Sequence, residues 1–233
     1  MTMPADGKTE AYFVTGTGTE IGKTHMSALF VRDALRAGKR VAYVKPVQTG
    51  HPPDDDAAVV REFVARECGP GFAPGGADAD RLTTMTLYVA DEPVAPCFVL
   101  DRLRAKADHF PAGVTPQAPT PEAFPIRGVA DAVRAVLDAG EHDLLLVESA
   151  GGLLVPLDET RTNADLARTL GLPLLAVVPN RLGCIHDAAQ LAYYVEREGL
   201  PFAGFLVNDH FASSEVNRLR NREWIGRHGA IFE

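Results

Sequence analysis

A glycine-rich run at residues 16–24, with the sequence GTGTEIGKT, restricts the folds open to this chain. A short apolar segment precedes the run and a stretch of helical periodicity follows it, so it joins a strand to a helix. In that setting the glycines allow a tight turn, and amide groups at the start of the helix face phosphate oxygens. The run therefore predicts a phosphate-binding loop, with five residues between its first glycine and Gly22 where four are usual.

Each position of the loop has an expected part in binding a nucleotide. The Lys23 ammonium would neutralise the β- and γ-phosphates of ATP, and the Thr24 hydroxyl would ligate Mg²⁺. The alternative is a glycine turn whose lysine only begins a helix, and the combination of strand, glycines, lysine and threonine disfavours it. We therefore expect ATP and Mg²⁺ as cofactors. The predicted nucleotide-binding positions in the loop are Gly16, Thr17, Gly18, Thr19, Glu20, Ile21, Gly22, Lys23 and Thr24.

The rest of the chain alternates short apolar runs with amphipathic stretches, which predicts an α/β fold with a mostly parallel sheet and helices on both faces. The expected strands are residues 12–14, 41–44, 144–147, 174–178 and 205–207. The expected helices are residues 23–37, 56–67, 126–139, 163–170, 185–198 and 213–227. We expect a single P-loop NTPase-type domain over residues 1–233, with the glycine- and proline-rich segments 69–80 and 108–125 as surface loops.

The composition narrows the class of partner. A formal net charge of −8 and a pI near 5.4 argue against binding to nucleic acid or anionic lipid, so a small molecule is the expected partner. Cys68, Cys97 and Cys184 lie far apart without metal or redox spacing, which suits a reducing compartment. The first ten residues lack the apolar core of a signal peptide, and no apolar run is long enough to span a membrane. The expected location is the cytoplasm.

Polar residues directly after the apolar runs are candidate ligands, because ligands gather outside the carboxyl ends of parallel strands. Lys45 follows the run at 41–44, where it would either neutralise a reacting anion or extend into solvent. Glu148 follows the run at 144–147, a position suited to an acid that holds Mg²⁺. The glycines after it leave room for a substrate.

Several further positions keep two interpretations each. Among Asp54, Asp55 and Asp56, one would cap the following helix or act as a second magnesium ligand. Cys184 lies at a helix start whose N–H groups would receive a substrate carboxylate. Its thiol is either a nucleophile or a packed side chain, and packing is favoured because no catalytic histidine arrangement accompanies it. Asn208 would read a base edge or end its strand.

Several motifs in register resemble the dethiobiotin synthetase family, ATP-dependent ligases of the P-loop NTPase superfamily. The matching stretches, which together span residues 12–209, are GTGTEIGKT at 16–24, KPVQTG at 45–50, EPVAP at 92–96, VESAGGLLVPL at 147–157, RLGCI at 181–185 and AGFLVND at 203–209. The resemblance implies a homodimer that takes 7,8-diaminononanoate, CO₂ or bicarbonate, and ATP. Such an enzyme closes the ureido ring of dethiobiotin in biotin biosynthesis and releases ADP and phosphate, without nucleic acid or membrane as a partner.

The resemblance also implies roles for individual residues. Lys45 and Lys23 would be the catalytic cations that stabilise the γ-phosphate and carbamate anions. The groups that organise Mg²⁺ would be Thr24, Asp56 and Glu148. The substrate contacts would be Thr49, Gly151 and Gly152, together with Gly183, Cys184 and Ile185 from across the dimer interface. Asn208 would hydrogen-bond to adenine.

Four residues depart from the family pattern. Gly18 stands where many members carry aspartate, and Ser149 replaces the first glycine of Glu-Gly-Ala-Gly-Gly. Cys97 replaces a histidine, and His186 replaces an asparagine. Members also continue past the position of Glu233 toward a segment that contacts adenine, so we expect relaxed nucleotide affinity or base selectivity. These departures bear most on the identity of the amine substrate.

Two other functions compete with ring closure. A paralogous ATP-dependent carboxylase or ligase acting on another amine is motivated by the departures at Ser149, Cys97 and His186. A P-loop ATPase whose nucleotide state controls binding to a partner is disfavoured, because residues 17–20 lack the early lysine frequent in such proteins. In that second function the KPVQTG segment would also have no evident purpose.

Overall fold

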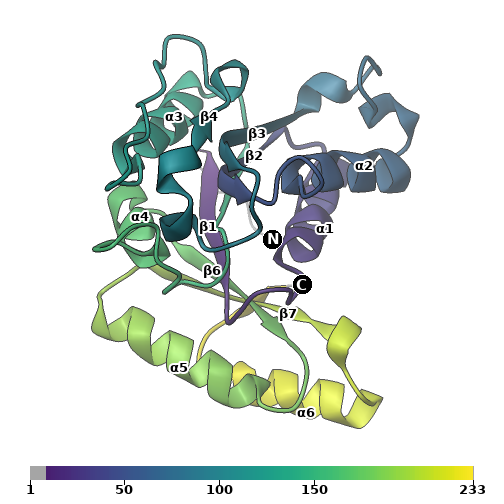
Figure 1. Cartoon of the computed structure of the whole chain (residues 1–233). Coiled ribbons are helices and arrows are strands. Elements are labelled where there is room, and N and C mark those ends of the chain that lie inside the picture. Colours follow the sequence, from purple (N-terminus) through teal and green to yellow (C-terminus); the bar gives the residue numbers. More distant parts are fainter. Residues whose placement is uncertain (1–8, 233) are drawn as a thin grey trace.

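The apolar runs of the sequence form neighbouring strands of one sheet in the computed structural model, which describes residues 9–232 (Figure 1). Over those residues the sheet has eight strands in the order β4-β3-β2-β5-β1-β6-β7-β8, and every neighbouring pair is parallel except β3 and β4. The strands are β1 (Glu10–Gly16), β2 (Val41–Thr49), β3 (Leu82–Ala90), β4 (Arg104–Ala105), β5 (Leu144–Glu148), β6 (Leu174–Pro179), β7 (Phe202–Asn208) and β8 (Ile231–Phe232). The expected α/β class with a mostly parallel sheet is confirmed.

The connections between parallel strands are helices, as the amphipathic stretches predict. They are α1 (Lys23–Arg36), α2 (Asp56–Cys68), α3 (Ile126–Ala139), α4 (Asn163–Leu170), α5 (Cys184–Arg197) and α6 (Glu215–Ile225). Local signals fix several ends: Thr162 and Asp165 form a capping box at the start of α4, and Gly171 ends that helix with φ of 66°. The expected helix boundaries are right to within two residues at each end.

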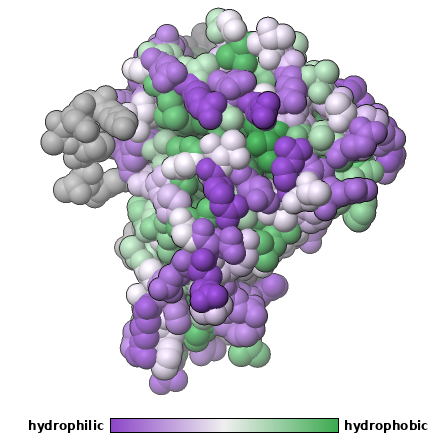
Figure 2. Space-filling model, turned by 90° about the vertical axis from the view of Figure 1, so that its left-hand side faces the viewer, coloured by the Kyte–Doolittle hydropathy of each residue, from purple (hydrophilic) through white to green (hydrophobic). Residues whose placement is uncertain are grey.

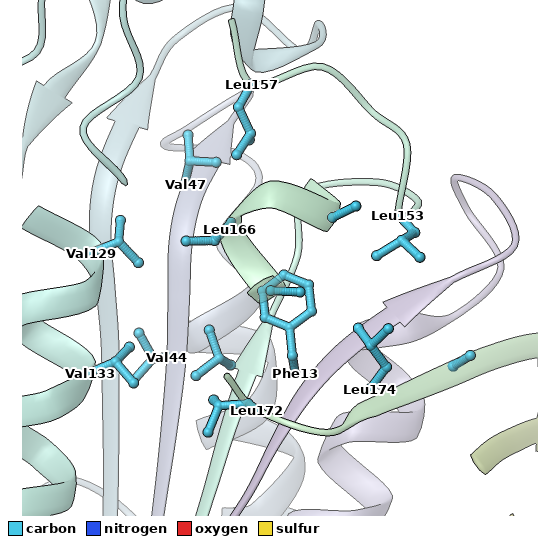
Figure 3. Close-up of a cluster of buried hydrophobic side chains, with 14 of the residues drawn as sticks. Phe13, Val44, Val47, Val129, Val133, Leu153, Leu157, Leu166, Leu172 and Leu174 are labelled. Atoms are coloured by element: carbon cyan, nitrogen blue, oxygen red, sulfur yellow. The ribbon is translucent and has the colours of Figure 1, made fainter. Parts of the chain in front are cut away.

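The sheet separates two hydrophobic layers. On one face α1 and α2 pack against side chains such as Tyr43 and Leu146, and on the other α3, α4 and α5 cover a larger core (Figure 1). Figure 3 shows part of that larger core, in which Phe13 from β1 lies among Leu166, Val44 and their neighbours. Both faces of the sheet are therefore covered, which explains why the central strands are almost continuously apolar.

Strand β3 was not predicted, and β2 extends beyond the predicted range of 41–44. Lys45 does not follow a strand end; it lies within β2, which continues to Thr49 because β3 keeps pairing with it. The pairing of β2 with β5 stops at Val44, one residue before Lys45. The polar character of β3 at Thr83, Thr84 and Thr86, outside the apolar pattern, explains why that strand was not predicted.

The two segments expected as loops contain short 3₁₀ helices and irregular backbone. Pro70–Phe72 and Ala79–Arg81 form single turns in the first segment, and most of the second has no regular structure. The second segment is attached to the core, since the Tyr88 hydroxyl donates to the Gln117 carbonyl at 3.0 Å. The Gln117 side chain in turn accepts from the Gly128 N–H at 3.0 Å.

Among the described residues, no helix has the length and apolar character needed to cross a membrane. The face of the molecule seen in Figure 2 mixes hydrophilic with hydrophobic residues rather than presenting one uniform hydrophobic surface. The three cysteines are free thiols.

Replacing the core residue Phe13 by alanine should destabilise the protein strongly. Phe13 is fully buried, so Phe13→Ala is expected to lower the free energy of unfolding by about 3–5 kcal/mol through lost burial and a residual cavity. The matched control is Phe98→Ala at an exposed phenylalanine, with an expected change below about 0.5 kcal/mol. Urea titration followed by circular dichroism measures both; equal changes would contradict the placement of the core.

Candidate active site

A cavity of about 790 Å³ opens at the carboxyl ends of the central strands, where β1, β2 and β5 end. Its walls come from the phosphate-binding loop, the end of β2, the start of α2, the segment after β3 and the segment after β5. The sequence-predicted residues among its lining are Thr19, Glu20, Gly22, Lys23, Thr24, Lys45, Thr49, Asp56, Glu148 and Gly151. Segments far apart in the sequence therefore meet at one site, as the strand-end argument expects.

The phosphate-binding loop is compact, and contacts with Asn208 and Lys23 hold it in place. Gly22 has φ of 82°, and a Cβ atom there would come within 2.4 Å of the Asn208 side-chain nitrogen, so a glycine is required on both counts. The Lys23 ammonium donates to the Gly18 carbonyl across the loop at 3.0 Å. Burial lowers the pKa of Lys23, and the nearby charge of Lys45 adds to this effect. An incoming phosphate would relieve both costs.

Lys45 forms a buried ionic cluster with two carboxylates. Its ammonium lies 2.5 Å from Asp56 Oδ2 and 3.1 Å from Glu148 Oε1, and it also donates to the Ser149 carbonyl at 3.2 Å. Glu148 is fully buried and Lys45 is only 3% exposed. Burial opposes the charge of Lys45, but the two carboxylates outweigh burial and raise its pKa. Lys45 likewise outweighs burial at Asp56 and lowers the pKa of that carboxyl. Lys45 and Asp56 are therefore both charged near neutral pH.

The Glu148 carboxylate is the centre of a wider hydrogen-bond network. Thr24 donates to Oε1 at 3.0 Å, and Ser27, from the next turn of α1, donates to Oε2 at 2.6 Å. Ser27 was not predicted, although its spacing of four residues from Lys23 places both on one face of α1. The fully buried phenol of Tyr43 is also close, and burial together with Glu148 raises its pKa well above the usual value.

The oxygen atoms around Glu148 suit a magnesium ion that is also bound by water and by substrate phosphates. Within residues 9–232 no group of three or more His, Cys, Asp or Glu side chains is arranged to hold a metal by itself. Magnesium usually keeps several waters and binds through one or two carboxylates plus substrate phosphates. Glu148, Asp56 and the Thr24 hydroxyl, directly beside the phosphate loop, supply that kind of partial oxygen shell.

The three consecutive aspartates have different environments. Asp55 is the N-cap of α2, where its carboxylate accepts from the Ala58 N–H at 2.9 Å. Asp56 is the first residue of the helix and points its carboxylate toward Lys45. Gln48 fixes this start, because its side-chain oxygen accepts from the Asp56 N–H at 3.1 Å. Of the two roles expected for these aspartates, Asp55 therefore caps the helix and Asp56 faces the site.

Other predicted residues lie outside the lining of this cavity. Asn208 is buried under the phosphate loop, donating to the Ile21 carbonyl at 3.0 Å and accepting from the His210 N–H. The side chain of Cys184 is buried in the core, and burial raises the pKa of its thiol. Gly183, with φ of 97°, is the N-cap of α5 and follows the fully exposed Leu182.

The fold and the phosphate loop define a P-loop nucleotide-binding protein. Residues 10–68 and 105–231 match the AAA domain family. Two solved structures share the fold: a ParA family ATPase from Chlorobium tepidum TLS and the signal recognition particle receptor FtsY from Elizabethkingia anophelis. Their TM-scores are 0.51 and 0.53, at 16% and 12% sequence identity. The matches cover 95% and 96% of this chain, and 83% and 57% of those chains.

Within that class, the chain belongs to the dethiobiotin synthetase family. It is 34% identical over 220 residues to the ATP-dependent dethiobiotin synthetase BioD of Anaeromyxobacter dehalogenans strain 2CP-C, covering 91% of this chain and 86% of that protein. It is 37% identical over 195 residues to the BioD protein of Streptomyces avermitilis, covering 83% of this chain and 69% of that protein. The family resemblance drawn from the motifs is confirmed.

The buried ionic cluster makes a prediction about stability. Lys45→Met should lower the free energy of unfolding by about 3–5 kcal/mol, because it leaves the buried Glu148 carboxylate without its cation. The double variant Lys45→Met/Glu148→Gln should recover much of the loss, since no unpaired charge then remains fully buried. Denaturant titrations of both variants test this.

The control for that experiment is Arg134→Met, which removes an exposed ion pair with Asp131 and should leave stability nearly unchanged. Equal destabilisation by Lys45→Met with and without Glu148→Gln would contradict the coupling between the two charges.

Proposed function

We propose that this protein is an ATP-dependent dethiobiotin synthetase, a ligase that closes the ureido ring from 7,8-diaminononanoate and CO₂. The observation that carries the proposal is the meeting of Lys23, Lys45 and the Glu148 carboxylate in one cavity beside the phosphate loop, in a chain of this family. Two cations there suit a reaction whose intermediates are all anions.

The reaction begins with carbamate formation. One amine of the substrate attacks the carbon of CO₂, and loss of its proton leaves a carbamate anion. Thr49 and Gly151 line the cavity near Lys45, and we assign them to holding the diamine and its carbamate. The ammonium of Lys45 stays protonated in this environment, so its role is to attract the carbamate rather than to remove a proton.

ATP then activates the carbamate. A carbamate oxygen attacks the γ-phosphorus, the bond to the β-phosphate oxygen breaks, and ADP leaves. The second amine attacks the carbonyl carbon of the mixed anhydride, phosphate leaves with the former carbamate oxygen, and a proton is lost as the ring closes. Lys23 and Lys45 would compensate the charge on the transferred group, so the protein acts by positioning and charge neutralisation.

Magnesium belongs to the proposal through the oxygen groups around Glu148. We assign Thr24, Asp56 and Glu148 to holding it, with the nucleotide phosphates completing its ligands. When bound, the ion would neutralise phosphate charge. Residues 16–24 would bind the triphosphate, and we assign Asn208, which lies next to that loop, to the adenine.

A homodimer completes the proposed site. Gly183, Cys184 and Ile185 do not line the cavity that contains Lys23 and Lys45. If the N–H groups at this start of α5 receive the substrate carboxylate, a second copy of the chain must bring them there. The fully exposed Leu182 beside them is suited to burial in such a contact. A cytoplasmic location accords with three free thiols and with the use of ATP.

A ligase acting on another amine is the second candidate, favoured by one observation. Cys97 stands where a histidine is usual and follows Pro96, which lines the cavity. The residue directly after this part of the cavity wall therefore differs from the family pattern. The same assay distinguishes the two candidates when other diamines are included.

The test is phosphate release by purified protein with magnesium-ATP and bicarbonate, with and without 7,8-diaminononanoate, followed by mass detection of the ring-closed product. We expect release that requires the diamine and matches product in amount. Lys45→Ala should lower kcat by about 1,000-fold, because a cation facing the transferred group is lost.

The matched control is Lys106→Ala, a lysine outside the cavity, which should retain wild-type turnover. Product from a different diamine alone would select the second candidate, and nucleotide binding without any product would overturn both.

A further inference from the structure

The segment after β5, residues 149–152, which we call the glycine loop, is held by two buried side chains that no part of the proposed mechanism uses. The Ser149 hydroxyl donates to the Gly151 carbonyl at 2.8 Å. The Asn163 amide, from the start of α4, donates to the carbonyls of Ala150 and Gly152, each at 2.8 Å. Ser149 and Asn163 are both almost completely buried.

The orientation of the Asn163 amide follows from its neighbours. Two carbonyl oxygens accept from its nitrogen, so the reverse orientation would bring three oxygens together. This arrangement leaves the Asn163 Oδ1 atom buried without a hydrogen-bond partner. A buried oxygen without a partner is unfavourable. The Asn163 side chain therefore holds the glycine loop although its own oxygen makes no hydrogen bond.

Fixing these carbonyls also fixes the amide groups between them. In a trans peptide the C=O and N–H groups point in opposite directions. Because the carbonyl of Ala150 faces Asn163 and that of Gly151 faces Ser149, the N–H groups of Gly151 and Gly152 face away from these side chains. Neither N–H donates to any acceptor among the described residues.

The two glycines that carry these N–H groups lie next to the cavity and the phosphate loop. Gly151 lines the cavity next to Glu148. Gly152 packs on the phosphate loop so closely that a Cβ atom there would come within 3.0 Å of the Gly16 carbonyl oxygen. Paired N–H groups in such a turn form a concave site for anionic oxygens.

We propose that Ser149 and Asn163 are positioning residues that present the N–H groups of Gly151 and Gly152 to the phosphoryl group passing from ATP to the carbamate. This inference rests on the proposed function only for the identity of the phosphoryl acceptor, the carbamate. The anion that the glycine loop would bind is the terminal phosphate of the nucleotide. Lys23 and Lys45 would place positive charge next to that anion, and the glycine loop would supply neutral hydrogen-bond donors in a fixed orientation.

The test uses Ser149→Ala and Asn163→Ala, which remove the donors without adding charge. Calorimetry without the diamine compares a non-hydrolysable ATP analogue with ADP, both with magnesium. We expect affinity for the ATP analogue to fall roughly tenfold in each variant and affinity for ADP to change by less than about twofold, since only ATP carries the terminal phosphate. In turnover, kcat should fall about 10- to 100-fold, with KM for the diamine nearly unchanged.

The control is Thr162→Ala, which removes the N-cap of the same helix but no bond to the glycine loop. It should lower Tm while keeping both affinities and kcat. Wild-type ratios of ATP-analogue to ADP affinity in both loop variants would overturn the inference, as would equal losses for the two nucleotides. If Asn163→Ala does not fold, Ser149→Ala decides. Because the binding measurement needs no diamine, failure of ring closure by the wild type would overturn only the proposed function.

Discussion

The buried contact of Lys45 with Glu148 and Asp56 is the interaction on which the site depends. Charged groups leave water at a large cost, which is offset only when oppositely charged partners and hydrogen-bond donors lie at short range. Here the partners come from β2, β5 and α2, so the cost is offset only if these elements are in register. The fold and the charge arrangement of the cavity therefore require one another. The same contact keeps the lysine protonated, and hence available to an anion, throughout the neutral pH range.

The cavity combines charge neutralisation with little evident acid–base machinery. Two lysines line the cavity, where phosphate and carbamate anions would meet in the proposed reaction, and carboxylate and hydroxyl oxygens that would hold a divalent cation lie beside them. Such a site suits a reaction in which ATP makes a poor leaving oxygen into phosphate and the amines supply the nucleophiles. The N–H groups of the glycine loop would add neutral hydrogen-bond donors in a fixed orientation. Catalysis on this account is a matter of holding reactants in line and compensating their charge.

Much of this arrangement could be predicted from the sequence, because the apolar runs and the glycine-lysine-threonine signal are local. The central strands, the helices and the meeting of Lys23, Lys45 and Glu148 at one edge follow from them. The strand β3 was missed because its first half is rich in threonine. Lys45 was expected after the end of β2, but it lies within that strand because pairing with β3 continues to Thr49. Ser27 and Asn163 escaped because their partners are 121 and 11 to 13 residues away in the chain, and only the folded chain brings them together.

In the proposed reaction the carbamate, rather than water, receives the phosphoryl group in this cavity. The most direct measurement uses ¹⁸O-labelled CO₂ with magnesium-ATP and 7,8-diaminononanoate, rapid quenching, and mass analysis of the phosphate released. The account predicts one labelled oxygen in that phosphate, because the attacking carbamate oxygen stays on phosphorus when the ring closes. Phosphate without label would mean that water attacks ATP, and would contradict the account.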